Sequence, residues 1–324
     1  MEIGLTGASG FLGRQIIDQA VAGGDKVVAF SRSPRRELRG CARTESFGPG
    51  LHVNGLNAIV HLAGESIFGL WTKAKKERIF RSRVEGTRWI VKAIKGAPNP
   101  PKVLVCASGV GIYGDRGEEE LTERHTIGAG EFLAEVSRAW EAEAQEAASA
   151  GIRVVSVRVA LVLGPKGSLA VMQPIFRVGL GGRFGRGDQW MSWVHIRDIA
   201  KIFLYAVKTD TLSGPVNGAS PNPVRNGEFT KVLGTMCNKP TYCTVPSFFL
   251  RTLLPEQSTL VLDSQRVIPE KLLASGFEFQ FPSLNEALQD LIKAKVRPEP
   301  GPEATPAWGV SACRRVGVSA CRRR

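Results

Sequence analysis

The first thirteen residues, MEIGLTGASGFLG, constrain the fold of this chain more than any other stretch. A short apolar run with Ile3 and Leu5 is typical of a buried strand, and it ends at Gly7, the first glycine of a G-x-x-G-x-x-G pattern. Apolar residues then recur at the spacing of one helix face. A glycine turn between strand and helix allows close approach of a pyrophosphate to the backbone, next to the free N–H groups of the helix N-terminus. Rather than a plain tight turn, we expect a dinucleotide site at Gly7, Ser9, Gly10, Phe11, Leu12 and Gly13.

The next apolar run, 26–30, ends in Ser31 and Arg32, and this end indicates which dinucleotide binds. In NAD-binding units an acidic residue about 20 residues past the glycines binds the ribose 2′-hydroxyl. This chain has no acidic residue at that strand end. A hydroxyl and a guanidinium suit a 2′-phosphate, because arginine has a permanent charge and a planar set of donors. We therefore predict NADP, with Ser31 and Arg32 on its 2′-phosphate; a solvated basic loop is the alternative.

A second set of cofactor residues is expected after the apolar run 58–63. Small residues at its end would let the backbone pass close to an adenine or a ribose, although another strand-end turn would look the same. His61, inside the run, is predicted to be a core residue and not a ligand. From this region we predict cofactor contacts by Leu62, Ala63, Gly64 and Glu65. The basic helical segment that follows adds Arg83 as one more predicted contact.

The run 103–107 ends at Ser108, and Tyr113 follows in a glycine-rich stretch. A serine at the carboxyl end of a parallel strand points into the crevice where such sheets bind ligands. Ser108 and Tyr113 are therefore the candidate catalytic residues, with a polar strand end and a packed tyrosine as the alternative. The candidates for substrate binding are Gln189, Trp193 and His195, which follow the flexible loop 179–187. The same residues could equally form a loop-to-helix junction.

Strands alternate with helices through the first two thirds of the chain, which predicts an α/β fold with a doubly wound parallel sheet. We expect this domain over 1–235, with loop insertions for the substrate. The less regular segment 236–293 suggests a small, mostly helical C-terminal lobe. The remaining residues, 294–324, are rich in Pro, Glu and Arg and repeat the sequence GVSACRR; we expect a disordered basic tail.

Composition limits the partners and the compartment. The formal net charge is +13, yet no aromatic residues are interleaved with the basic ones as base stacking requires, so we do not expect nucleic acid. The six cysteines show no C-x-x-C spacing, which argues against a metal site or a disulfide framework.

No apolar run reaches the ~18 residues of a membrane span. The chain begins in its first strand, so a cytoplasmic location is expected, or a plastid or mitochondrion if a transit peptide has been removed.

These stretches together resemble the extended short-chain dehydrogenase/reductase superfamily, and more narrowly its atypical NAD(P)-dependent epimerase/dehydratase-like branch. That branch includes a human epimerase-family protein, bacterial relatives and a plastid-division protein. The resemblance covers roughly residues 1–292, and it implies a Rossmann-like domain, a small C-terminal domain and NADP as the cofactor. The motifs that carry it are 6–13 (TGASGFLG), 61–65 (HLAGE), 84–87 (VEGT), 107–114 (ASGVGIYG), 194–198 (VHIRD), 217–223 (NGASPNP) and 266–269 (RVIP).

The chain departs from the superfamily in its proton-transfer residues. The usual Tyr-x-x-x-Lys pair aligns with Leu133 and Ser137, and the usual serine aligns with Gly109. A phenol of pKa ~10 is a poor base at neutral pH without that lysine. We predict an NADP-dependent oxidoreductase or epimerase for an unidentified small substrate, which could be anionic or sugar-like. The alternative is a dinucleotide-sensing or assembly protein without turnover, and a homodimer is left open.

Overall fold

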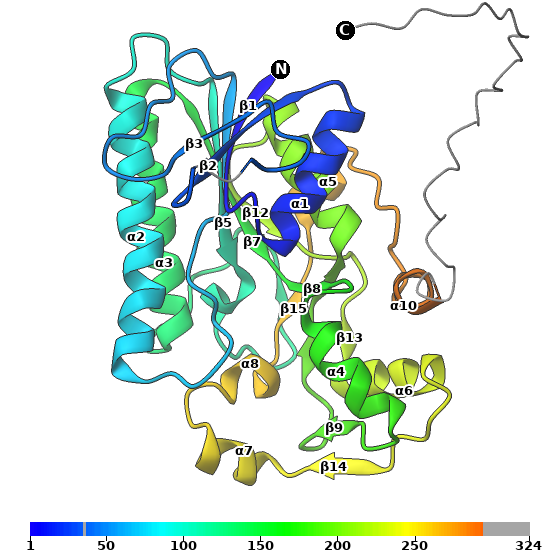
Figure 1. Ribbon diagram of the computed structural model, residues 1–324. Coiled ribbons are helices and arrows are strands. Elements are labelled where there is room, and N and C mark those ends of the chain that lie inside the picture. Colours follow the sequence, from blue (N-terminus) through cyan, green and yellow to red (C-terminus); the bar gives the residue numbers. More distant parts are fainter. Residues whose placement is uncertain (35–36, 294–324) are drawn as a thin grey trace, which may run out of the picture.

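The computed structural model describes residues 1–34 and 37–293; the predicted disordered tail, 294–324, lies outside them. Seven parallel strands form the central sheet in the order β12-β7-β5-β4-β1-β2-β3 (Figure 1). The order reverses between β1 and β4, and ligands of such sheets bind outside the carboxyl ends of the strands at this point. The strands are β1 (Glu2–Thr6), β2 (Lys26–Ser31), β3 (Arg43–Ser46), β4 (Ala58–His61), β5 (Val103–Gly109), β7 (Arg153–Val159) and β12 (Gly214–Gly218).

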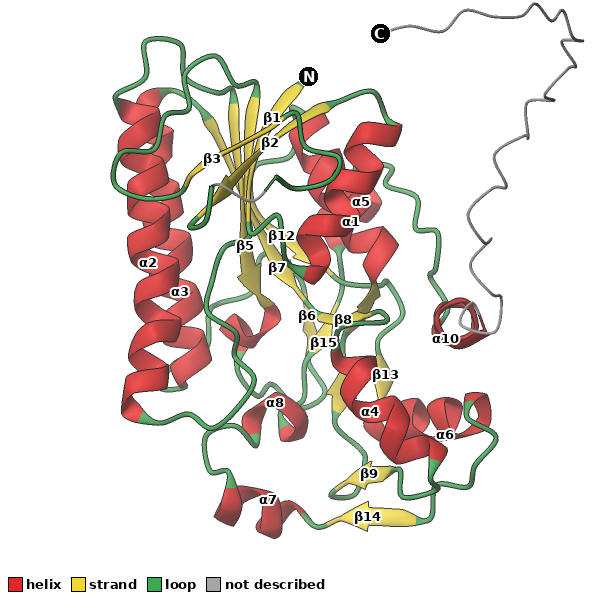
Figure 2. Cartoon of the chain, in the orientation of Figure 1, coloured by secondary structure: helices red, strands yellow, loops and turns green. Residues whose placement is uncertain are grey.

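Helices cover both faces of this sheet (Figure 2), which is why the central strands have apolar residues on both sides. One face is covered by α1 (Phe11–Ala22) and α5 (Ile196–Lys208), which contact each other. The other is covered by α2 (Lys73–Lys95) and α3 (Phe132–Gln145), and the short helix η2 (Glu146–Ala150) continues α3. The hydroxyl of Thr72 accepts a hydrogen bond from the N–H of Lys75 and so caps α2.

The apolar run 152–163 is divided between two sheets. Ala160 separates β7 from β8 (Leu161–Leu163), and β8 pairs with β11 (Trp193–His195) and not with the central sheet. This change carries the chain away from the sheet into a second lobe, seen at the bottom of Figures 1 and 2.

The second lobe is built from the middle and the end of the chain. Its C-terminal part is mostly helical, as predicted. Two parallel strand pairs join the two parts: β14 with β9, and β15 with β6. The remaining elements are η1 (Val110–Tyr113), β6 (Glu120–Leu121), α4 (Ser168–Arg177), β9 (Gly182–Phe184), β10 (Trp190–Met191), β13 (Val224–Arg225), α6 (Asn226–Met236), β14 (Cys243–Val245), α7 (Ser247–Leu253), α8 (Thr259–Leu262), β15 (Arg266–Val267), α9 (Glu270–Ala274) and α10 (Leu284–Lys293).

Residues 1–34 and 37–293 contain neither a candidate membrane span nor a candidate metal site. They contain no helix whose length and apolar content would suit a membrane crossing. They also contain no group of three or more His, Cys, Asp or Glu side chains placed to hold a metal ion.

Candidate functional site

The glycine turn between β1 and α1 has no room for a side chain at Gly7 or Gly13. Gly7 has φ 70°, and a Cβ there would lie 3.0 Å from the carbonyl carbon of Leu62. A Cβ on Gly13 would lie 2.8 Å from Cα of Ala8 and closer still to the carbonyl oxygen of Gly7. No side chain of any described residue caps α1 at Gly10, so the first-turn N–H groups keep their capacity to bind an anion. This arrangement fits the pyrophosphate of a dinucleotide.

Thr6, at the end of β1, holds this turn against the end of β4. Its Oγ1 accepts hydrogen bonds of 3.1 Å from the N–H groups of both Leu62 and Ala63. The same oxygen lies 2.6 Å from Nδ1 of His61, whose side chain is completely buried. Burial lowers the pKa of His61 to about 3, so the ring is neutral and its Nδ1 can accept the Thr6 proton. His61 is thus a core residue, as predicted.

The turn after β4 is supported by Arg83 of α2. Its Nη1 donates to the carbonyl oxygen of Glu65 at 3.0 Å, and a Cβ on Gly64 would lie 3.1 Å from the guanidinium carbon. Burial lowers the pKa of Arg83 to about 10. The predicted contact of Arg83 with the cofactor stays a prediction, whereas its support of the turn is visible.

Ser31 and Arg32 lie at the end of β2, beside this turn. The Ser31 hydroxyl accepts from the N–H of Ser33 at 3.1 Å, and Arg32 is exposed. The hydrogen bond from Lys75 holds the pKa of Glu65 below its usual value, and the charge of Arg32 contributes to this shift. The structure therefore brings Arg32 to the same edge of the sheet as the two turns.

Ser108, at the end of β5, is 5% exposed, and its hydroxyl has no hydrogen-bond partner within the described part of the chain. Beside it, a Cβ on Gly109 would lie 3.9 Å from the hydroxyl oxygen of Ser137. The ring of Phe11 packs against Gly164, the residue that follows β8. Its Cε2 atom would lie 3.0 Å from a Cβ at Gly164. Ser108 thus has a buried hydroxyl, without a partner among the described residues, at the edge of the sheet that carries the glycine turn.

Tyr113 does not fit its predicted catalytic role, because its side chain has no exposed surface. Its hydroxyl donates to Oδ1 of Asn217 at 2.8 Å and accepts from Nη1 of Arg158 at 2.9 Å. Arg158 is in turn paired with Glu141 of α3 at 2.9 Å. Burial raises the pKa of Tyr113, which favours the protonated phenol. The tyrosine holds η1 against β7 and β12, which is the packed-tyrosine alternative.

The predicted substrate residues are also engaged within the protein. Trp193 is fully buried, and its Nε1 donates to the carbonyl oxygen of Asn222 at 3.0 Å. His195 is fully buried and caps α5, with Nδ1 accepting from the N–H of Arg197 at 3.1 Å. Gln189 is half-buried and donates to two backbone carbonyl oxygens. Trp193 and His195 therefore form a loop-to-helix junction, the alternative that the sequence left open.

Three acidic residues at the end of η1 were missed by the sequence analysis. We call Asp115, Glu131 and Asp263 the carboxyl cluster. Burial, together with the charges of Glu131 and Asp115, raises the pKa of Asp263 to about 8. Oε1 of Glu131 accepts from the N–H of Asp115 at 3.4 Å, and Asp115 Oδ1 accepts from the N–H of Ser264 at 3.1 Å. Only the adjacency of Asp115 to the 107–114 motif could have indicated the cluster, because Asp263 comes from the far end of the chain.

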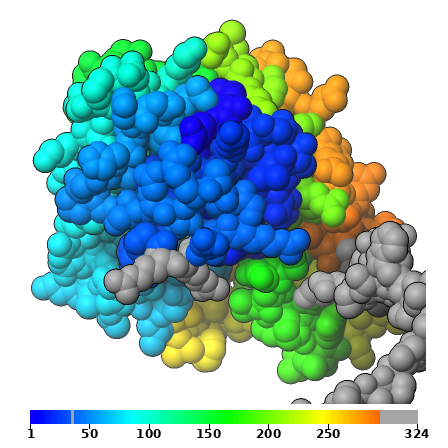
Figure 3. Space-filling view, turned by 45° about the horizontal axis from the view of Figure 1, so that its top comes forward, coloured from blue at the N-terminus to red at the C-terminus, as the bar shows by residue number. Residues whose placement is uncertain are grey.

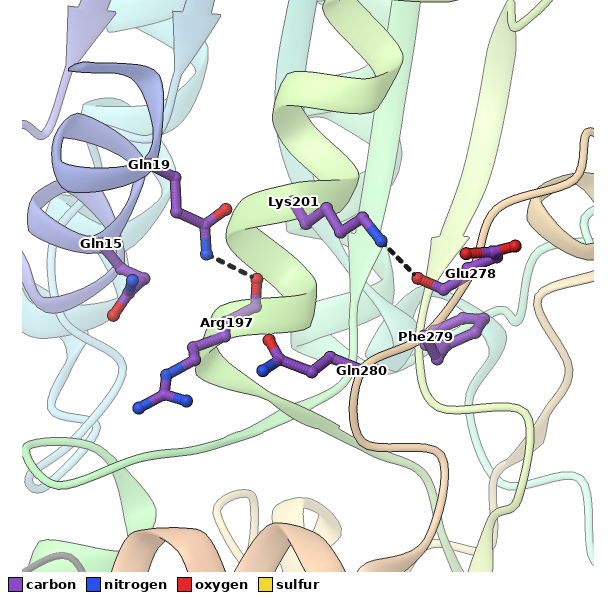
Figure 4. Close-up of a pocket in the computed structure, with 7 residues that line it drawn as sticks. All are labelled: Gln15, Gln19, Arg197, Lys201, Glu278, Phe279 and Gln280. Atoms are coloured by element: carbon purple, nitrogen blue, oxygen red, sulfur yellow. Dashed lines mark hydrogen bonds between the residues drawn. The ribbon is translucent and has the colours of Figure 1, made fainter. Parts of the chain in front are cut away.

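A separate cavity of about 560 Å³ lies on the solvent side of α1 and α5 (Figure 4). Nε2 of Gln19 donates to the carbonyl oxygen of Arg197 at 2.9 Å, and Nζ of Lys201 donates to that of Glu278 at 2.7 Å. These bonds hold the two helices and the segment before α10 together. The cavity is lined by Gln15, Gln19, Arg197, Lys201, Glu278, Phe279 and Gln280.

Comparison with known proteins agrees with this geometry. Residues 3–217 match the family model described as "NAD dependent epimerase/dehydratase family", and residues 245–291 match a domain of unknown function. The chain is 37% identical to the epimerase family protein YfhF of Bacillus subtilis (90% of this chain, 98% of the relative). It is 34% identical to a chloroplastic SDR39U1 homologue of Arabidopsis thaliana (90% and 87%).

The fold also matches a solved structure, that of human epimerase family protein SDR39U1 with NADPH. The TM-score is 0.83 at 30% identity, covering 90% of this chain and 99% of the human chain. The crowded glycine turn, the parallel sheet and these matches lead to one conclusion: the chain belongs to the NAD dependent epimerase/dehydratase family.

Proposed function

We propose that this protein is an NADP(H)-dependent oxidoreductase or epimerase-like enzyme. The observation that carries the proposal is the turn at Gly7–Gly13, which has no room for a Cβ at Gly7 or Gly13 and leaves α1 without a side-chain cap from any described residue. Family membership supports a nicotinamide dinucleotide. The NADPH bound to the human relative supports the phosphorylated form.

Each part of NADP has residues that would hold it. The backbone of the glycine turn, from Gly7 to Gly13, would bind the pyrophosphate. Ser31 and Arg32 would bind the 2′-phosphate, and the turn at Leu62–Glu65 would lie along the nucleoside. When bound, NADP(H) would supply the hydride chemistry of the reaction.

The chain's own groups would bind the reacting oxygen and move its proton. The Ser108 hydroxyl has no hydrogen-bond partner among the described residues and would donate to a substrate carbonyl oxygen. Because Tyr113 is buried, we assign the proton to the pair formed by Glu131 and Asp263. With the pKa of Asp263 raised to about 8, this pair holds a proton at neutral pH and would pass it to the oxygen as the carbon receives the hydride.

A single-turnover experiment tests this function. NADPH-loaded protein is mixed with a panel of carbonyl compounds and nucleotide sugars, and loss of nicotinamide absorbance is followed. Ser108→Ala should reduce the rate of any active pair about 100-fold, because one donor to the developing oxyanion is removed. Ser213→Ala, at an exposed position, is the matched control. An unchanged rate in Ser108→Ala would remove the assignment.

The second candidate is a dinucleotide-binding protein without turnover. Leu133 and Ser137, in place of the superfamily's tyrosine and lysine, favour it. Tight NADPH binding without oxidation by any member of the panel would support this candidate over the enzyme.

A further inference from the structure

Three cations act on one carboxylate at the edge of the sheet that carries the glycine turn. Oε1 of Glu65, in the turn after β4, accepts from Nζ of Lys75 at 2.7 Å, and Nε of Arg78 lies 3.7 Å from the same oxygen. The hydrogen bond from Lys75 lowers the pKa of Glu65, and the charges of Arg78 and Arg32 contribute to this shift. In Figure 3 the blue of the N-terminal residues borders the lighter blue and cyan of the segment that leads into α2. Cations from α2 and from the end of β2 thus meet at Glu65.

One face of α2 fixes the position of Glu65. Lys75, Arg78 and Ser82 recur at helical spacing, so their side chains lie on the same face of the helix. The Ser82 hydroxyl accepts from the N–H of Glu65 at 2.8 Å, and Nη1 of Arg83 donates to the carbonyl oxygen of Glu65 at 3.0 Å. The backbone of Glu65 is therefore fixed relative to the two cations of α2.

The two cations of α2 have donors beyond those that Glu65 uses. The side chain of Lys75 is 14% exposed, whereas that of Arg78 is 60% exposed. An ammonium group has three donors, so Lys75 can keep its bond to Glu65 and still donate to a second acceptor. The Nε of Arg78 lies beyond hydrogen-bond distance of Glu65, and a guanidinium presents a planar set of donors that suits the oxygens of a phosphate.

The charge of this group of residues suits a dianion. The three cations and the one carboxylate leave a surplus of two positive charges. The first turn of α2 contains no acidic residue, so the positive end of the helix dipole adds to the surplus, whereas the neighbouring Lys76 is paired with Glu256. A phosphate monoester carries about −1.5 to −2 charge at neutral pH. The 2′-phosphate of NADP would neutralise the surplus, and the 2′-hydroxyl of NAD would leave it in place.

We propose that Lys75 and Arg78, together with Arg32, bind the 2′-phosphate of NADP and determine the preference for NADP over NAD. Glu65 is a positioning residue: it holds Lys75 in place and competes with the phosphate for the cations. The preference for the phosphorylated cofactor then depends on α2 as well as on the end of β2. This inference rests on the proposed function and adds to it the residues that select the cofactor.

Four nucleotides separate the 2′-phosphate from the rest of the cofactor in binding experiments: NADPH, NADH, adenosine 2′,5′-bisphosphate and AMP. Their affinities are measured by calorimetry for the wild-type protein, Lys75→Gln and Arg78→Gln. We expect each variant to bind NADPH and the bisphosphate about tenfold more weakly, because one charge-assisted hydrogen bond is lost. The affinities for NADH and AMP should be unchanged, which also shows that the variants are folded.

Glu65→Gln should have the opposite effect. Loss of the carboxylate removes its repulsion of the phosphate, so NADPH should bind about threefold more tightly at low salt while NADH binding stays unchanged. A merely structural role of Glu65 would weaken both nucleotides. Arg88→Gln is the matched control and should change no affinity, because Arg88 is another exposed arginine of α2 and pairs with a different carboxylate, that of Glu143.

The other outcomes overturn the inference without touching the proposed function. Equal losses for NADPH and NADH in Lys75→Gln and Arg78→Gln would assign these cations to the pyrophosphate. Unchanged NADPH affinity in both variants would leave the 2′-phosphate to Arg32. Weaker NADPH binding in Glu65→Gln would contradict the competition between carboxylate and phosphate. Failure of the wild-type protein to bind either dinucleotide would instead defeat the proposed function.

Discussion

The hydroxyl of Thr6 and the ring of His61 form one buried contact, 2.6 Å long, between the ends of β1 and β4. Because Thr6 Oγ1 also accepts two backbone N–H groups, its own proton is directed to Nδ1 of His61. Two side chains thus fix the spacing between the glycine turn and the turn that follows β4.

Thr6→Val should destabilise the protein and weaken NADPH binding. The isosteric valine leaves two backbone N–H groups without an acceptor, at a cost of about 1–3 kcal/mol each. The free energy of unfolding in urea is the measurement. Thr6→Ser keeps the hydroxyl and should recover most of the loss; equal losses in both variants would contradict the role of the hydroxyl.

Gly13→Ala should abolish NADPH binding and lower the melting temperature. The added methyl group would overlap the carbonyl oxygen of Gly7 and Cα of Ala8, so the turn would have to open. Gly48→Ala is the control, because no atom of the described residues lies within 4 Å of a Cβ at that position. Both variants are compared by thermal unfolding with and without NADPH, and near-normal NADPH affinity in Gly13→Ala would show that the turn does not bind the pyrophosphate.

Arg32→Ala should weaken NADPH binding more than NADH binding. Loss of a charge-assisted hydrogen bond costs about 1.5–3 kcal/mol, which corresponds to roughly a 10- to 100-fold change in affinity. Only the phosphorylated nucleotide should show this change in calorimetry. Arg39→Ala, at another exposed arginine of the same loop, should leave both affinities unchanged. Equal losses for the two nucleotides would refute the assignment to the 2′-phosphate.

The pKa of Asp263, about 8 in the folded protein against an ordinary value of 3.8, predicts a pH dependence of stability. Between these values the folded state holds a proton that the unfolded state has lost. Stability should therefore fall as the pH rises from about 4 to 8, by at most about 1.4 kcal/mol per pH unit, and level off above 8. Asp263→Asn should flatten this profile in urea unfolding at several pH values. Asp18→Asn, an exposed site on α1, should keep the slope.

Local sequence signals predicted the parallel sheet and the glycine turn. Gly7, Gly10 and Gly13 are contiguous with their strand and helix, so a short pattern contains the whole feature. Arg32 and Ser108 follow directly on strands, and the parallel arrangement alone places them at one edge. These predictions needed no knowledge of distant contacts.

The remaining errors come from contacts between distant parts of the chain. Tyr113 is buried because Asn217 and Arg158 take up its hydroxyl, and neither partner is near it in the sequence. His195 is buried under Phe281, with 3.9 Å between ring centroids. The carboxyl cluster forms because the fold places Asp263, from the second lobe, beside Asp115 and Glu131. The type and position of a residue indicate that it can act, whereas its exposure depends on what folds over it.

The strand pairs β9–β14 and β6–β15 have a consequence for the evolution and engineering of this fold. Each C-terminal strand completes a partner encoded before residue 190, so the gene cannot be cut at 236 into two independent pieces. A shortened product would present two bare strand edges, which invite self-association. Swapping the C-terminal segment between relatives would therefore succeed only when β6 and β9 travel with it.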